Sequence, residues 1–159
     1  MAPMDERTIS KINMLNREFY QSFADSFSST RYQVQVGVRR ILKEIPPSSA
    51  ILDIGCGNGS ILKELAAQKF RGSYYGVDFS EKLIGESQRT YFSLKDSVDF
   101  RATFSVFDIV QSSWSDLPKV GEWEVVVAFA VLHHIPGGRE RSGIFKNIHA
   151  LLKPGGIFL

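Results

Sequence analysis

Glycines that follow an apolar stretch constrain this sequence more than any other feature. The stretch runs from Ile51 to Ile54 and includes Asp53, and glycines then occupy positions 55, 57 and 59. Glycine lets the backbone approach a bound molecule closely, and a helix that begins after the glycines directs its unpaired N–H groups and positive dipole end toward that molecule. We therefore predict a strand, a tight turn and a helix that together hold a small charged ligand.

The spacing of these glycines disfavours two common nucleotide sites. A dinucleotide fingerprint reads G-x-G-x-x-G, whereas Ser60 stands here where the third glycine is needed. A phosphate-binding P-loop requires Gly-Lys-Ser or Gly-Lys-Thr after its glycines, and neither follows. An NAD-dependent reductase stays a distant alternative, which titration with a nicotinamide cofactor would test.

Apolar runs alternate with helical patterns through the rest of the chain. Five runs are predicted to be strands: 50–54, 74–77, 98–107, 123–129 and a last one that opens at 156–159. Three helical patterns lie between them, at 60–68, 80–91 and 139–152, while 112–120 is predicted to be a loop with at most a short helix. Strands that alternate with helices predict an α/β fold, a doubly wound parallel sheet covered on both faces.

A helical segment precedes this alternation. Apolar residues recur at three- and four-residue steps at positions 9, 12, 15, 19, 23 and 27, which predicts an amphipathic helix that ends near Ser28. A second helical pattern covers 32–44, with Val34, Val38, Ile41 and Leu42 inward, and Pro46 and Pro47 end it. We expect residues 1–46 to cover the binding site and residues 47–159 to form the core.

The composition fits one domain without covalent or metal cross-links. The chain has 159 residues, of which 43% are hydrophobic, and a net charge of +2 that neither demands nor excludes a nucleic-acid partner. Its single cysteine, Cys56, provides neither an internal disulfide nor a cysteine-based metal site, which suits a reducing compartment. No apolar run approaches the ~20 residues that span a bilayer, so we expect a cytoplasmic protein without a membrane segment.

Acidic residues stand where predicted strands end, at the edge of a parallel sheet that binds ligands. Asp78 lies about 20 residues after Gly59, the interval typical of an acid that binds a ribose, and Phe79 beside it offers an apolar face to a base. The alternative is that Asp78 only caps the helix that begins near Ser80. Asp108 ends the third strand, where an acid can equally be a turn residue.

Two adjacent histidines, His133 and His134, follow the fourth strand. Neighbours in an extended chain point to opposite sides, and no metal-binding spacing accompanies them, so a metal site is disfavoured. We expect one histidine to act as a donor, an orienting group or a base, and a structural histidine in a turn is the alternative. No partner base accompanies Cys56, which we interpret mainly as a small packing residue.

These landmarks together resemble the class I S-adenosylmethionine-dependent methyltransferases. The strand, acid and G-x-G-x-G run is similar to their first motif, and the Pro154-Gly155-Gly156 turn is similar to the turn that leads into their fifth strand. The resemblance implies a Rossmann-like sheet, S-adenosyl-L-methionine as the cofactor and S-adenosyl-L-homocysteine as the product. It also implies a set of cofactor-binding residues, with Asp108 on the adenine amine: Tyr20, Asp53, Gly55, Cys56, Gly57, Gly59, Asp78, Phe79, Ser80, Asp108, Ile109, Phe129 and Ala130.

A narrower resemblance lies in the segment from Tyr20 to Arg31. Its Tyr/Ala/Phe pattern running into Ser-Ser-Thr-Arg is similar to the tRNA wobble-uridine carboxymethyl methyltransferases, and so is the segment 131–134. This resemblance implies that Arg31 and His134 are catalytic residues that line the acceptor pocket. Gln21 departs from the acidic residue often found there, and the general cofactor-covering helix of small-molecule methyltransferases is the alternative. The acceptor is thus expected to be a tRNA or a small molecule.

The end of the sequence raises an expectation about the sheet. A complete class I methyltransferase usually continues beyond its fifth strand, so the chain is expected to be truncated there, with an exposed sheet edge that promotes a homodimer or binds a partner subunit. A non-catalytic S-adenosylmethionine-binding module, acting as an interaction subunit, is the alternative to an enzyme.

Overall fold

A sheet of five parallel strands forms the centre of the protein. The computed structural model describes residues 4–30, 34–118 and 122–159, with the backbone alone for residues 23–30. The strands lie in the order β3-β2-β1-β4-β5. Their bounds are β1 Ala50–Ile54, β2 Ser73–Asp78, β3 Arg101–Val106, β4 Trp123–Val127 and β5 Leu152–Phe158. The predicted α/β fold with a doubly wound parallel sheet is confirmed.

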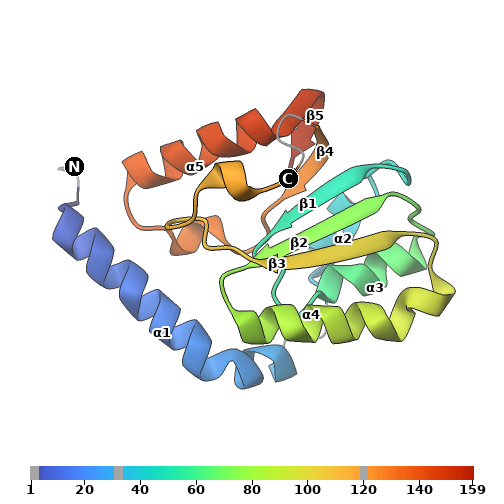
Figure 1. Cartoon of the computed structure of the whole chain (residues 1–159), viewed down its shortest axis with the longest axis horizontal. Helices are drawn as coiled ribbons and strands as arrows, with labels where there is room; N and C mark the ends of the chain where they lie inside the picture. The colour runs from blue at the N-terminus through green and yellow to red at the C-terminus, as the bar shows by residue number, and fades with distance from the viewer. Residues whose placement is uncertain (1–3, 31–33, 119–121) are drawn as a thin grey trace.

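Helices cover both faces of this sheet (Figure 1). Helices α3 (Ser60–Ala67) and α4 (Glu81–Leu94) lie on one face, with α2 (Val36–Leu42) beside α3, and α5 (Gly138–Leu151) lies on the other. Three short 3-10 helices complete the described chain: η1 Lys95–Ser97, η2 Trp114–Asp116 and η3 Leu132–His134. The short η2 agrees with the loop predicted at 112–120, of which residues 119 and 120 lie outside the described residues.

The sheet separates two hydrophobic clusters. In β1, Ile51 belongs to the cluster under α3 and α4, whereas Leu52 and Ile54 belong to the cluster under α5. Successive side chains of a strand point to opposite faces, and all three of these are fully buried. This explains why the central strands are continuous apolar runs rather than alternating ones.

Helix α1 (Glu6–Thr30) crosses the end of the sheet where β1, β2 and β3 terminate (Figure 1). It continues to Thr30, so the predicted break near Ser28 was wrong. Its apolar stripe does not simply face the core, because Leu15 is 51% and Phe19 is 53% exposed. The next helix, α2, is shorter than predicted, and Ile41, predicted inward, is 39% exposed while Leu42 is fully buried.

The strand order places the chain's reversal point at β1. Strand β1 pairs with β2 on one side and with β4 on the other: the chain runs outward from β1 through β2 to β3 and then crosses back to β4 on the opposite side of β1. Ligands of doubly wound sheets bind at such a point, beyond the carboxyl ends of the strands. Strand β5 begins at Leu152, earlier than predicted, and its pairing with β4 shifts register between Trp123 and Val125.

Within the described residues, none of the helices combines the length and the apolar character needed to span a membrane.

Candidate functional site

A cavity opens where β1, β2, β3 and β4 end, between the sheet and α1. Segments far apart in sequence contribute its wall: α1, the glycine turn, the ends of β2 and β3, and the segment after β4. The lining residues are Asn13, Asn16, Arg17, Tyr20, Gly55, Gly57, Asp78, Phe79, Leu83, Phe107, Asp108, Ile109, Val110, Gln111, Phe129, Ala130, Val131, His134 and Ile135.

The glycine turn presents backbone to this cavity. Gly55, Gly57 and Gly59 all have positive φ angles, of 73°, 57° and 73°, which side chains with a Cβ rarely adopt. The Gly55 N–H donates to the carbonyl of Val77 at 2.7 Å, which fastens the turn to β2. A Cβ on Gly55 would lie 2.3 Å from Cγ2 of Val131. The turn therefore requires glycine at position 55 for both conformation and space.

Asp78 joins the glycine turn to the start of α4. One carboxylate oxygen accepts a hydrogen bond from the Gly57 N–H at 3.0 Å, and the other accepts from the Ser80 N–H at 2.9 Å. Burial raises the pKa of Asp78, and the backbone hydrogen bonds from Ser80 and Gly57 oppose that rise. The helix cap is Ser80, whose Oγ accepts from the Leu83 N–H at 3.3 Å. Asp78 therefore connects the glycine turn to the residue before α4 through hydrogen bonds, and it also lines the cavity. The N-cap of α4 is Ser80, not Asp78.

Four residues of the expected cofactor set lie behind the cavity wall rather than on it: Asp53, Cys56, Gly59 and Ser80. Asp53 points toward the α3 and α4 side of the sheet, where its carboxylate accepts from the Tyr74 hydroxyl at 2.6 Å. Burial raises the pKa of Asp53 to about 7. Gly59 is the residue before α3, and Ser80 caps α4.

Cys56 is buried beside Ser87, with its Sγ 3.7 Å from Ser87 Oγ. Burial raises the pKa of the Cys56 thiol well above its ordinary value. A thiol that stays protonated is a poor nucleophile, so this environment agrees with a packing residue.

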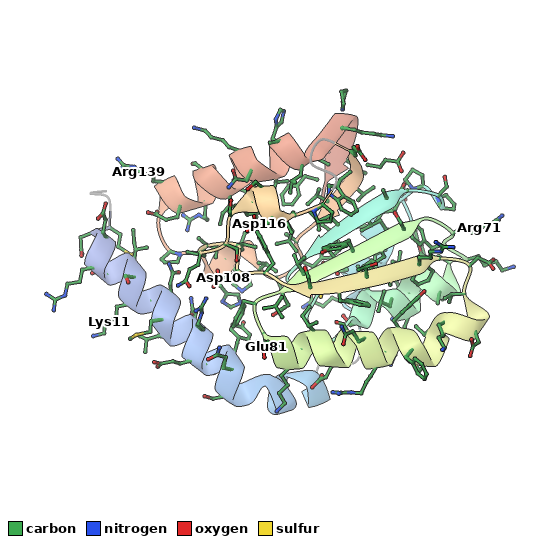
Figure 2. All side chains as sticks on the ribbon, viewed as in Figure 1. Lys11, Arg71, Glu81, Asp108, Asp116 and Arg139 are labelled. Atoms are coloured by element: carbon green, nitrogen blue, oxygen red, sulfur yellow. The ribbon has the colours of Figure 1, made fainter. Side chains whose placement is uncertain are left out.

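Asp108 lies at the end of β3, facing α1 (Figure 2). One of its carboxylate oxygens accepts from the N–H groups of Val110 at 2.8 Å and Gln111 at 3.2 Å. The other oxygen forms an ion pair with the guanidinium of Arg17. Asp108 thus organises its turn and lines the cavity at the same time.

Tyr20 and His134 meet at the cavity from opposite sides. The hydroxyl of Tyr20, on α1, lies 2.6 Å from Nε2 of His134, on η3, and their rings are 5.2 Å apart. The side chain of Asn16 donates to the carbonyl of His134 at 2.8 Å. His133 is exposed, with its ring 3.8 Å from that of His134. Of the two histidines, His134 lines the cavity.

Arg31, the other expected catalytic residue, lies outside the described residues. Phe129 and Ala130 line the cavity just after β4, and Ala130 adopts a positive φ of 58°.

Sequence reasoning missed the polar face of α1. Asn13, Asn16 and Arg17 line the cavity together with Tyr20. These positions follow the three- and four-residue spacing of one helix face, so the signal was present in the sequence. It was hidden because the apolar residues of the same helix repeat with the same period.

Among the described residues, no three His, Cys, Asp or Glu side chains gather closely enough to hold a metal ion.

Residues 52–158, which include the last three residues of β1, the glycine turn and all of β5, match the family model of a methyltransferase domain. The chain belongs to this family. The match begins inside the strand that leads into the glycine turn, so the family relationship includes the cavity wall made by the core.

Two curated methyltransferases illustrate the range of relatives. The tRNA (carboxymethyluridine(34)-5-O)-methyltransferase of Arabidopsis thaliana is 33% identical over 141 residues, which cover 88% of this chain and 30% of that protein. A sterol 24-C-methyltransferase of Gibberella zeae is 28% identical over 141 residues, which cover 88% of this chain and 32% of that protein. The chain spans less than a third of the length of either relative.

Solved structures agree with the family. A SAM-dependent methyltransferase from Methanosarcina mazei is 29% identical to this methyltransferase domain, with a TM-score of 0.61, and the match covers 75% of this chain and 54% of that one. Family and fold confirm the expected class I, S-adenosylmethionine-dependent methyltransferase with its Rossmann-like sheet, and S-adenosylmethionine as its cofactor.

Proposed function

We propose that the cavity binds S-adenosylmethionine and that the domain transfers its methyl group to a polar acceptor held beside His134. The observation that carries this proposal is the convergence of Gly55, Gly57, Asp78 and Asp108 on one cavity beneath α1. Residues 1–46 are proposed to act as the cover of this site.

The residues at the cavity suit this cofactor chemically. Gly55 and Gly57 line the cavity without side chains, so the methionine and ribose portion can approach their backbone closely. The Asp78 carboxylate can only accept hydrogen bonds when ionised, which matches the hydroxyl groups of a ribose. Phe79 and Ile109 offer apolar surfaces to an adenine ring, and Asp108 can accept a hydrogen bond from its amine.

Methyl transfer requires mainly positioning from this chain. The bound cofactor supplies a methyl group that is already activated on a sulfonium sulfur. His134, held by Tyr20 and Asn16, is proposed to orient the acceptor in line with that methyl group. Arg31 is proposed to hold an anionic acceptor, because a guanidinium binds a carboxylate through two parallel hydrogen bonds.

The lining of α1 favours a polar acceptor over a sterol. Asn13, Asn16 and Tyr20 face the cavity, while Leu15 and Phe19 are exposed on the helix surface. A sterol would bury its rings against apolar side chains, whereas amide and hydroxyl groups need hydrogen-bonding partners. We therefore propose an acceptor of the kind named for the tRNA relatives, the carboxymethyl group of uridine 34.

The test is methyl transfer to tRNA that carries carboxymethyluridine at position 34, measured as formation of S-adenosylhomocysteine, with a detergent-dispersed sterol as the competing acceptor. We expect transfer to the tRNA and none to the sterol. The variant His134→Ala should lose about a hundredfold in rate, because misalignment of an acceptor costs that much. Its matched control, His133→Ala, removes the exposed neighbouring ring and should keep the wild-type rate.

The outcomes separate the alternatives. Transfer to the sterol alone would overturn the acceptor assignment and keep the enzyme. Binding of S-adenosylhomocysteine by calorimetry without transfer to either acceptor would favour the non-catalytic binding module.

We also propose that the edge of β5 mediates self-association. Strand β5 ends the sheet order, and Ile157 on it is 41% exposed. An edge strand offers unpaired N–H and C=O groups to another chain, and a charged side chain blocks such pairing. Light scattering should therefore detect dimers that the variant Ile157→Lys abolishes. Wild-type protein that stays monomeric at every concentration would refute this proposal.

A further inference from the structure

Helix α1 is fastened over the cavity at two separate places. At the first place, the side chains of Asn16 and Tyr20 form hydrogen bonds with His134. At the other, Arg17 reaches the loop after β3, where its Nη2 forms the ion pair with Asp108 and donates to Oε1 of Gln111 at 3.0 Å. Because Arg17 follows Asn16 directly on the helix, one turn of α1 contacts both the β3 side and the β4 side of the cavity.

The hydrogen bonds at Asp108 leave room for one more donor. An ionised carboxylate has about four lone-pair sites on its two oxygens. The N–H groups of Val110 and Gln111 occupy two of them on one oxygen, and Arg17 occupies one on the other. The oxygen that binds Arg17 can thus accept one further N–H group from a molecule in the cavity.

The Arg17 contact is strong enough to matter and exposed enough to open. The side chain of Arg17 is 38% exposed and that of Asp108 is 20% exposed, so solvent screens the ion pair only partly. The second acceptor, Gln111, fixes the orientation of the guanidinium. A contact of this kind can break and re-form while the rest of the fold stays intact.

We infer that Arg17 is a positioning residue of the cofactor site, which holds α1 closed over the bound cofactor through the same carboxylate that accepts the adenine amine. The inference rests on the proposed binding mode at Asp108. Release of S-adenosylhomocysteine then requires the Arg17 contact to open, so this contact limits the exchange of product for fresh cofactor.

The same helix offers a matched control. Lys11 carries the same charge on α1, but it is exposed and does not line the cavity. Figure 2 shows Lys11 on the side of α1 that faces away from the sheet. Substitution of Lys11 changes the net charge as substitution of Arg17 does, without touching the contact to Asp108.

The experiment measures dissociation of S-adenosylhomocysteine by stopped flow. The fluorescence of Trp114 can report it, because the Trp114 indole N–H donates to the carbonyl of Ile109 at 3.2 Å on the cavity loop. Arg17→Ala should dissociate about tenfold faster than wild type, since a charge-assisted hydrogen bond is lost. Arg17→Lys should restore part of the slow rate, and Lys11→Ala should match wild type.

Two further readouts distinguish closure of α1 from a general loss of structure. High salt should accelerate release from the wild type and leave Arg17→Ala unchanged. Hydrogen exchange without cofactor should be faster in the α1 amides of Arg17→Ala, while the amides of β1 and β4 stay protected as in wild type.

Different results would refute the role of Arg17 and the proposed binding of the cofactor. If Arg17→Ala releases the product at the rate of Lys11→Ala, or if its α1 amides exchange as slowly as those of wild type, Arg17 does not hold α1 closed. If the wild type binds no S-adenosylhomocysteine, the proposed function falls and the inference with it. An S-inosylhomocysteine probe, which lacks the amine, tests Asp108 itself: binding as tight as that of S-adenosylhomocysteine would remove Asp108 from adenine recognition.

Discussion

The two walls of the cavity are built in contrasting ways. The glycine turn presents backbone atoms, fixed by positive φ angles and by the hydrogen bond from Gly55 to Val77. The opposite wall, α1, presents side chains, and its attachment depends on contacts such as Arg17 with Asp108 and Tyr20 with His134. Backbone conformation leaves a strong sequence signature, whereas side-chain contacts between distant segments leave a weak one. The first wall was therefore predictable in detail, whereas on α1 the sequence analysis named Tyr20 and missed Asn13, Asn16 and Arg17.

Of the substitutions that test this difference between the two walls, Gly55→Ala in the glycine turn should have the largest effect on stability. Gly55→Ala places a Cβ 2.3 Å from Val131 and forces alanine into a positive φ. We expect a loss of about 2 to 4 kcal/mol in the free energy of unfolding, measured by urea denaturation. The control is Gly143→Ala in α5, where a Cβ meets nothing within 4 Å, and which should gain about 0.5 to 1 kcal/mol. Equal effects at the two positions would contradict a space-limited turn.

Removal of the Asp78 carboxylate should weaken the turn and the binding together. Asp78→Ala leaves the N–H groups of Gly57 and Ser80 without their acceptor, and we expect at least about tenfold weaker binding of S-adenosylhomocysteine by calorimetry. Ser80→Ala removes only the cap of α4, costs about 1 kcal/mol of stability and should keep the affinity. Unchanged affinity in Asp78→Ala would remove Asp78 from the cofactor site.

Asp53, behind the turn, should make stability depend on pH. Burial raises its folded-state pKa from 3.8 to about 7, so the folded protein retains the proton in this interval. The resulting stabilisation is complete below about pH 4 and is lost as pH rises to about 7. Asp53→Asn should therefore be more stable than wild type by roughly 1 to 3 kcal/mol at pH 8, and by less at pH 4.

Tyr74→Phe provides the check on this pH dependence. It removes the hydroxyl that lowers the Asp53 pKa, so stability should keep falling to a higher pH than in wild type. Thermal melts from pH 4 to 8 measure both variants. A pH dependence identical in wild type and Asp53→Asn would show that another group is responsible.

The outer face of α1 should tolerate polar substitutions best. Leu15 and Phe19 are about half exposed, so Leu15→Gln and Phe19→Ser should each change the free energy of unfolding by less than about 1 kcal/mol. Chemical denaturation measures both. A loss above about 2 kcal/mol in the free energy of unfolding would show that these side chains are packed in the core.

The core of the fold could be predicted because its signals are local. The strand at 50–54 was predicted with its observed bounds, since an apolar run between two prolines and a glycine turn has few alternatives. The strand predicted at 98–107 is shorter, 101–106, because β3 pairs with β2 only from Arg101 to Val106, and residues 98–100 connect η1 to the strand. Strand β5 begins at Leu152, where the register shift lets the Pro-Gly-Gly turn lie within the strand.

Most of the cavity lining could also be predicted, but the sequence did not show which acidic side chains at the strand ends line the cavity. Asp53 and Asp78 both sit at strand ends, yet only Asp78 lines the cavity. Asp53 precedes the last residue of β1, so its side chain points to one face of the sheet, under α3 and α4. Asp78 is the last residue of β2 and turns toward the glycine loop. The difference depends on where each strand stops, which composition and spacing do not specify.

The central pairing of β1 with β4 has a consequence for how the chain is made. Ile51 pairs with Val125, so the middle of the sheet closes only after the whole segment between them has been synthesised. Strands β1, β2 and β3 with α3 and α4 can assemble earlier through shorter connections, while closure of the long one is slow. A nascent chain therefore emerges from the ribosome with half a sheet and no complete ligand site. S-adenosylmethionine in the cell can stabilise only the last step of folding, by binding the closed form.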